Sequence, residues 1–130
     1  MNEADNDYLD ALEDISEGYE VELNSLGEAL KGLDSQRPNS GKEAIQVASR
    51  IHDLGKRARS MKPSQMFEES HQVFLKGAAA FDLAMDELIA VAGGDAKRAE
   101  KAPDTVGSHI EEGIRLIEQS TTLLNRLVTD

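Results

Sequence analysis

The 130-residue chain has no cysteine and no tryptophan, and only 4% of its residues are aromatic. Without cysteine it can form no disulfide, thiolate zinc site, c-type haem attachment or cysteine nucleophile. It also lacks an excess of basic residues, because 25 acidic residues stand against 14 basic ones and give a formal net charge of −11. Nonspecific nucleic-acid binding needs a surface of Lys and Arg, so we expect no nucleic-acid partner.

Long apolar runs are absent as well. No stretch approaches the roughly 20 apolar residues of a membrane span, so no transmembrane segment is expected. Residues 1–5 include neither the basic nor the apolar region of a signal peptide. We therefore expect a chain that is soluble as written, and an extracytoplasmic location only if Met1 follows a removed leader. The length fits one domain over residues 1–130, since domains cluster near about 100–150 residues.

What the sequence does contain is helical periodicity, in four segments near residues 5–33, 41–61, 65–92 and 96–129. In each segment apolar residues recur in steps of three and four, which places them on one helical face. The first two lines are Tyr8, Leu12, Ile15, Tyr19, Leu23, Leu26, Leu30, Leu33 and Ala44, Val47, Ile51, Leu54, Ala58, Met61. The last two are Phe67, His71, Phe74, Ala78, Phe81, Met85, Leu88, Ala92 and Ile110, Ile114, Ile117, Thr121, Leu124, Val128.

Polar, proline-containing or glycine-containing stretches separate these segments. Amphipathic helices with short connections predict an all-α fold, an antiparallel up-down-up-down four-helix bundle. Pro103 lies inside the fourth segment, so we expect that helix to be kinked or split near this residue. Several glycines inside the predicted helices indicate close approach of neighbouring helices or room for a ligand. They are Gly18, Gly27, Gly55, Gly77 and Gly113.

The net charge is distributed unevenly. Residues 1–34 hold eleven acidic residues and one lysine, whereas residues 35–62 hold seven basic and two acidic residues. These segments face each other in an antiparallel hairpin, so we expect their opposite charges to favour the pairing of the first two helices. Lys56 and Arg57 should then lie level with Asp14 and Glu17. Because exposed ion pairs contribute only about 0–1 kcal/mol each, the effect should be on the choice of neighbour.

One spacing is typical of metal sites. Glu68 and His71 form a Glu-x-x-His motif, whose members share a helical face. In the expected bundle His52 lies roughly opposite Phe74, and Glu22 lies in a neighbouring layer. Glu68, His71, His52 and Glu22 are therefore a candidate site for zinc or a similar divalent ion. The structural alternative is that His71, on the apolar face, bonds to a carboxylate such as that of Glu22 or to a hydroxyl.

Histidine phosphotransfer is a less favoured alternative. Four-helix phosphotransfer domains expose a histidine that Leu-Lys-Gly follows closely, and these small and basic neighbours admit the phosphoryl group. After His52 the same residue types occur in another order, and after His71 they occur at another distance. His71 also lies on the inward-facing line, where a phosphoryl group could not reach it.

A pattern of aromatic and small residues extends from the second turn signal into the fourth segment. Its members are Pro63, Phe67, His71, Phe74, Gly77, Phe81, Gly94, Asp95, Ala102 and Gly113. In this pattern the chain resembles a group of small bacterial extracytoplasmic proteins of unknown function, many of them lipoproteins. The resemblance covers about half the chain and implies a helical bundle, anchored or secreted, with no known activity. The sequence departs from the group in lacking a leader and a lipobox cysteine.

No motif of nucleophilic catalysis or phosphate binding is present, neither Gly-x-Ser-x-Gly nor a phosphate loop. We therefore predict a non-enzymatic acidic bundle for protein interaction or scaffolding, with a protein partner or a second copy of the chain. No cofactor is expected unless the divalent metal site forms. The expected partner surface comprises the widened apolar face of the fourth segment and outlying leucines. Its members are Leu116, Leu123, Leu127, Leu9, Leu75 and Leu83.

Overall fold

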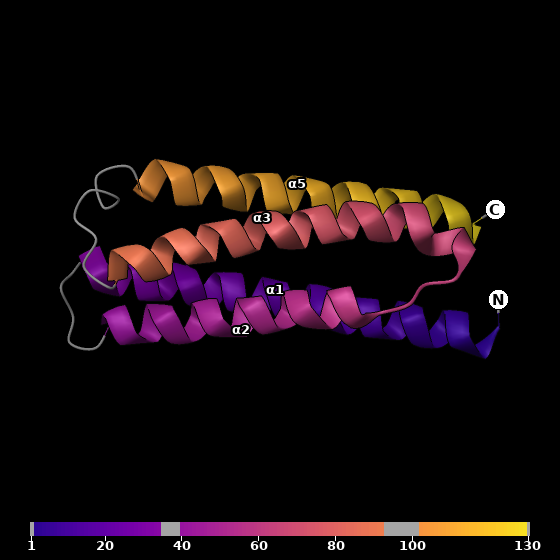
Figure 1. Ribbon diagram of the computed structural model, residues 1–130, viewed down its shortest axis with the longest axis horizontal. Helices are drawn as coiled ribbons and strands as arrows, with labels where there is room; N and C mark the ends of the chain where they lie inside the picture. Colours follow the sequence, from indigo (N-terminus) through magenta and orange to yellow (C-terminus); the bar gives the residue numbers. More distant parts are fainter. Residues whose placement is uncertain (1, 35–39, 93–101, 130) are drawn as a thin grey trace.

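The computed structural model describes residues 2–34, 40–92 and 102–129, and these residues confirm the all-α fold. They form α1 (Glu3–Asp34), α2 (Ser40–Ser60), α3 (Glu68–Ala92) and α5 (Ala102–Thr129), with a 3-10 turn, η1 (Gln65–Phe67), before α3. The helices run antiparallel in the predicted up-down-up-down order (Figure 1). None of the described helices has the length and hydropathy that a membrane span requires.

The ends of the helices follow local signals. The side chain of Asn2 accepts a hydrogen bond from the Asp5 backbone N–H at 2.8 Å and so caps α1. Pro103 lies in the first turn of α5, where a missing N–H leaves no helical hydrogen bond unmade. From Ala102 onward α5 is one helix, and the part of the expected kink or split that concerns residues 96–101 lies outside the described residues.

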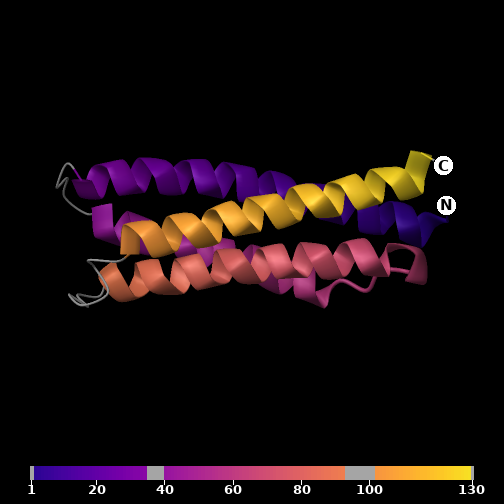
Figure 2. The ribbon, with the colours of Figure 1, turned by 90° about the horizontal axis from the view of Figure 1, so that it is seen from above.

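The helices pack in the order of the chain: α1 on α2, α2 on α3, and α3 on α5. Among the described residues, no Cα atom of α1 comes within 8 Å of a Cα atom of α3 or α5. Seen from above, α5 runs at an angle to α1 (Figure 2). The bundle is therefore closed along three of its seams and open along the fourth, between α1 and α5.

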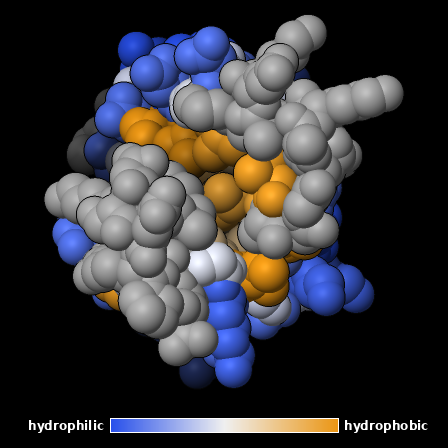
Figure 3. Space-filling model, turned by 90° about the vertical axis from the view of Figure 1, so that its left-hand side faces the viewer, coloured by the Kyte–Doolittle hydropathy of each residue, from blue (hydrophilic) through white to orange (hydrophobic). Residues whose placement is uncertain are grey.

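The core is built around three phenylalanines that recur every seven residues, one at the end of η1 and two in α3. Phe67, Phe74 and Phe81 are each at most 1% exposed. Tyr8 of α1 stacks on Phe67 with ring centroids 5.3 Å apart, and Tyr19 lies 4.8 Å from Phe81. The end view shows hydrophobic surface at the centre and hydrophilic residues around it (Figure 3).

The apolar lines predicted for the first three segments are confirmed as core faces wherever their side chains are described, with Leu23 and Met61 only partly buried.

The fourth predicted line is a core face only in part, because Ile110, Ile117 and Leu124 are partly buried against the core whereas the other members are exposed. Ile114 and Val128 are 41% and 39% exposed, and the residues that α5 buries are Val106, Gly113 and Ser120. These three small or medium residues, seven apart, let the backbone of α5 come close to α3. A Cβ added to Gly113 would lie 2.6 Å from the Phe81 ring, closer than any real contact. The face of α5 that lies most deeply against α3 is therefore the one with the least bulk, and Ile117 packs beside it against Gly77.

Glycine allows close approach at three other predicted positions. A Cβ on Gly77 would lie 3.1 Å from the Gly113 carbonyl, and one on Gly18 would lie 2.8 Å from the Leu54 side chain. Gly55 makes room for charged side chains of α2 and α3. At Gly27 the expectation is wrong, because nothing lies within 4 Å of an added Cβ.

Candidate functional site

An open groove of about 400 Å³ runs along the seam where α1 and α5 do not meet. Its apolar lining comes from three helices: Tyr19, Leu23, Phe81, Ile114 and Ile117. The rings of Tyr19 and Phe81 are buried and form its floor, whereas Ile114 stands open to solvent. Sequence periodicity had marked both isoleucines as core residues. The groove therefore lies between α1 and α5, where the four-helix bundle is expected to have its fourth helix–helix contact.

The hydroxyl of Tyr19 is buried and has no hydrogen-bond partner among the described residues. Burial raises the pKa of Tyr19 far above its ordinary value; the Asp82 carboxylate raises this pKa further, and Arg59 acts in the opposite direction. The hydroxyl therefore stays protonated at any physiological pH. Leaving such a group unpaired costs about 1–3 kcal/mol.

Acidic side chains border the groove. Glu20 of α1 and Glu118 of α5 line it from opposite sides, and both residues are exposed. Neither carboxylate has an ion-pair partner within the part of the chain that the structure describes. The lining of the groove includes no lysine or arginine. The groove is therefore apolar along its length and has an acidic residue at each of its two edges, which we call its rims.

A second, more polar cleft of about 340 Å³ lies between α1 and α2. Arg50 lines it, and its guanidinium donates a 2.8 Å hydrogen bond to the Glu22 carboxylate across the two helices. The contact is an instance of the predicted pairing between the acidic first helix and the basic second one. Its main effect is on how α1 and α2 align.

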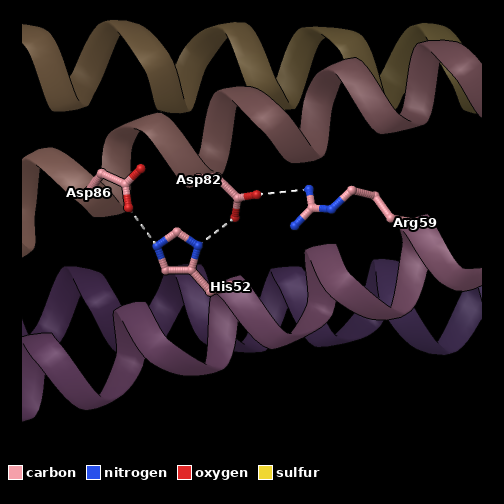
Figure 4. Close-up of polar contacts among 4 residues, drawn as sticks. All are labelled: His52, Arg59, Asp82 and Asp86. Carbon is pink, nitrogen blue, oxygen red and sulfur yellow. Dashed lines mark hydrogen bonds and ion pairs between the residues drawn. The ribbon is translucent and has the colours of Figure 1, made fainter.

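A cluster of four charged or polar side chains joins α2 to α3 (Figure 4). The imidazole of His52 lies between two carboxylates, with Nδ1 2.9 Å from Asp82 Oδ1 and Nε2 3.0 Å from Asp86 Oδ1. Arg59 donates a 2.9 Å hydrogen bond to the other oxygen of Asp82. The contact of His52 with Asp82 lacks hydrogen-bond geometry, since Asp82 Oδ1 has no hydrogen-bond partner among the described residues. Only the doubly protonated ring carries an N–H toward both carboxylates.

Gly55 lies directly beside this cluster and leaves space for it between the helices. A Cβ at this position would lie 3.2 Å from both the Arg59 guanidinium and the Asp82 carboxylate. The geometry does not suit a metal ion, because the two carboxylates lie at opposite nitrogens of the ring. Ligands of one ion must converge on a single point.

His71 has the opposite environment, since it is only 2% exposed. Its Nδ1 is hydrogen-bonded at 2.8 Å to the hydroxyl of Tyr8, and its Nε2 has no hydrogen-bond partner among the described residues. Burial lowers the pKa of His71 below its ordinary value of 6.5, while the backbone of Ala58 acts in the opposite direction. Burial also raises the pKa of Tyr8 to about 12. The structural interpretation of His71, with a hydroxyl as its partner, is confirmed.

The four predicted metal ligands are not brought together. His71 bonds to Tyr8, Glu22 pairs with Arg50, and His52 lies between two aspartates. Glu68 is exposed in the first turn of α3. Within residues 2–34, 40–92 and 102–129, no three His, Asp or Glu side chains are placed to hold one ion.

Neither histidine suits phosphotransfer. His71 is buried, and the two carboxylates at the ring nitrogens of His52 would repel a phosphoryl group.

Sequence reasoning missed the partners of His52 because it placed this residue opposite Phe74. The linker over residues 61–64 is extended and carries the chain beyond the end of α2 before α3 begins (Figure 1). An extended residue advances about 3.3 Å, against 1.5 Å in a helix, so α3 starts further along the bundle than a tight turn would allow. The carboxylates of Asp82 and Asp86, four residues apart on one helical face, were the available signal.

The comparisons with known proteins add no relative: no protein-family model, curated protein or solved structure matches the chain.

Proposed function

We propose that the protein is a non-enzymatic interaction module that holds a helical segment of a partner protein in the groove between α1 and α5. One observation carries the proposal. The aliphatic residues Ile114 and Ile117 of α5 line an open groove, and the buried aromatic rings of Tyr19 and Phe81 line it as well. In the described residues no Cα atom of α1 lies within 8 Å of a Cα atom of α5 there.

Binding of a helical segment in the groove would be favoured by burial of its exposed apolar side chains. Burying a side chain such as Ile114 fully is worth about 1.5–3 kcal/mol relative to leaving it exposed. A helix that enters a groove buries such residues with apolar anchors at positions i, i+3 or i+4 and i+7. The groove already has helices as both walls, so an added helix would complete the packing of the bundle.

The contacts of the titratable groups support the non-enzymatic part of the proposal. The side chains of His71 and Tyr8 are hydrogen-bonded to each other in the core. His52 of α2 contacts the carboxylates of two aspartates of α3. In both places the polar atoms serve the packing of helices, away from the groove lining. A general base or nucleophile would need to face bound substrate.

The test is photocrosslinking in the cells that naturally produce the protein. Ile114→p-benzoylphenylalanine puts the crosslinker in the groove, and Leu83→p-benzoylphenylalanine puts it on an apolar residue of α3 that is 53% exposed and does not line the groove. We expect an adduct from position 114 alone, which mass spectrometry maps to an amphipathic helical segment of another protein. No adduct, equal adducts from both positions, or an adduct between two copies of this chain would contradict the proposal.

A further inference from the structure

We infer that the occupant of the groove is a basic amphipathic helix, with aliphatic side chains on one face and Lys or Arg on both flanks of that face. The inference rests on the proposed function, because it takes the α1/α5 groove as the binding surface. It adds the chemistry of the partner, which the apolar floor alone leaves open.

The charge on the rims is the first argument. Glu13 and Glu20 lie seven residues apart on one side of α1, and Glu111 and Glu118 repeat that spacing on α5. All four residues are exposed. An apolar helix in the groove would therefore have carboxylates on either side of it. Basic flanking residues would complement them, and acidic ones would be repelled.

The same rims argue against a second copy of this chain as the occupant. In a symmetric dimer the second copy would present the same groove, and Glu20 and Glu118 line that groove in each copy. Arg115, the nearest base on α5, already pairs with Glu112 of its own helix. Like charges placed opposite each other oppose association.

The length of the groove sets the length of the contact. Its lining on α1 extends from Ser16 to Asn24, which is about 12 Å at 1.5 Å per helical residue. About two turns of a bound helix fit along this distance. Two or three apolar anchors on consecutive turns would contact Leu23, Ile114 and Ile117.

The probes are three 18-residue helical peptides with the same leucine line, flanked by Lys, Glu or Gln. Each is titrated into ¹⁵N-labelled protein, and the amide shifts give both the site and the Kd. We expect the shifts to centre on residues 16–24 and 114–118. The Lys peptide should bind about tenfold more tightly than the Glu peptide at low ionic strength, and the ratio should narrow in high salt.

The outcomes separate the inference from the proposed function. Equal affinities, or tighter binding of the Glu peptide, with shifts in the groove would overturn the basic partner and leave the groove as a binding surface. Absence of groove shifts with every peptide would count against both. Shifts spread over the acidic surface of α1, away from the groove, would also overturn the inference.

A pair of matched variants tests the rims directly. Glu20→Gln with Glu118→Gln removes two rim charges, and Asp53→Asn with Glu69→Gln removes two exposed charges outside the groove. Both variants change the net charge equally. We expect the rim variant to lose about fivefold in affinity for the Lys peptide and the control to lose less than twofold. Equal losses would mean that net charge alone attracts the peptide, which would overturn the inference.

Discussion

Helix α3 contacts α5 and α1 in different ways. Toward α5 the backbones come close over Gly77 and Gly113, and the Ser120 hydroxyl donates a buried 2.9 Å hydrogen bond to the Ser70 carbonyl. Toward α1 no Cα atoms lie within 8 Å in the described residues, and aromatic rings bridge the gap, as Tyr19 does with Phe81.

The difference shows how one bundle can be rigid along one seam and open along another. Close backbone packing leaves no space for a side chain larger than hydrogen at its contact points. Ring contacts reach across a wider gap and leave room beside them. The groove lies where α5 packs closely on α3 while no Cα atom of α1 comes within 8 Å of a Cα atom of either helix in the described residues.

The largest expected effect comes from breaking the close seam. Gly113→Ala places a methyl group 2.6 Å from the buried ring of Phe81, and we expect a loss of about 2–3 kcal/mol in the free energy of unfolding. Gly27→Ala is the matched control on α1, where an added methyl meets nothing within 4 Å. It should stabilise by about 0.5–1 kcal/mol through helix propensity. Denaturant titration measures both, and equal stabilities would show that the seam is not closely packed.

An intermediate effect comes from the ring-mediated contact of α1. Tyr8→Phe keeps the stacking on Phe67 but removes the hydroxyl that pairs with His71. Leaving the imidazole nitrogen unpaired should cost about 1–2 kcal/mol. In a double-mutant cycle with His71→Leu, the two losses should be less than additive. Additive losses would separate the two residues energetically and would contradict the hydrogen bond.

The smallest expected effect is a pH dependence. Because burial lowers the pKa of His71 in the folded state, the unfolded chain binds this proton at a higher pH than the native one. Its contribution to stability is therefore complete above about pH 6.5 and is lost as the pH falls below that value, by at most about 1.4 kcal/mol per pH unit.

Urea titrations from pH 8 to pH 5 measure this loss, and His71→Gln is the comparison. The difference in stability between wild type and variant should shrink as the pH falls. A constant difference over the whole range would mean that His71 does not titrate differently in the two states.

Most of the fold follows from the sequence, because three of the four helices bury the residues that periodicity selects. The helix α5 follows the prediction only in part, because it has both an aliphatic face, which is half exposed, and a buried face of small residues. A hydropathy pattern favours Ile114 over Gly113, yet close approach of two backbones depends on the absence of bulk. The groove could not be predicted, since it results from this choice of face.

The site residues show a similar limit. His71 lies in the core, as its place on the apolar line predicts, but the choice of Tyr8 as partner depends on how α1 crosses α3. The predicted charge pairing between α1 and α2 occurs at Glu22 and Arg50, whereas Arg59 pairs with Asp82 of α3. Exposed ion pairs contribute little free energy, so local geometry determines which of several acidic residues each basic residue pairs with.

The cluster around Asp82 also affects how α2 and α3 are aligned along their axes. His52 and Arg59 are two turns apart on α2, about 10.5 Å along its axis, and both reach the same carboxylate from opposite directions. Sliding α3 along α2 in either direction would lengthen one of these contacts. This shared anion therefore favours the observed alignment of α2 and α3, in addition to the packing of their apolar side chains.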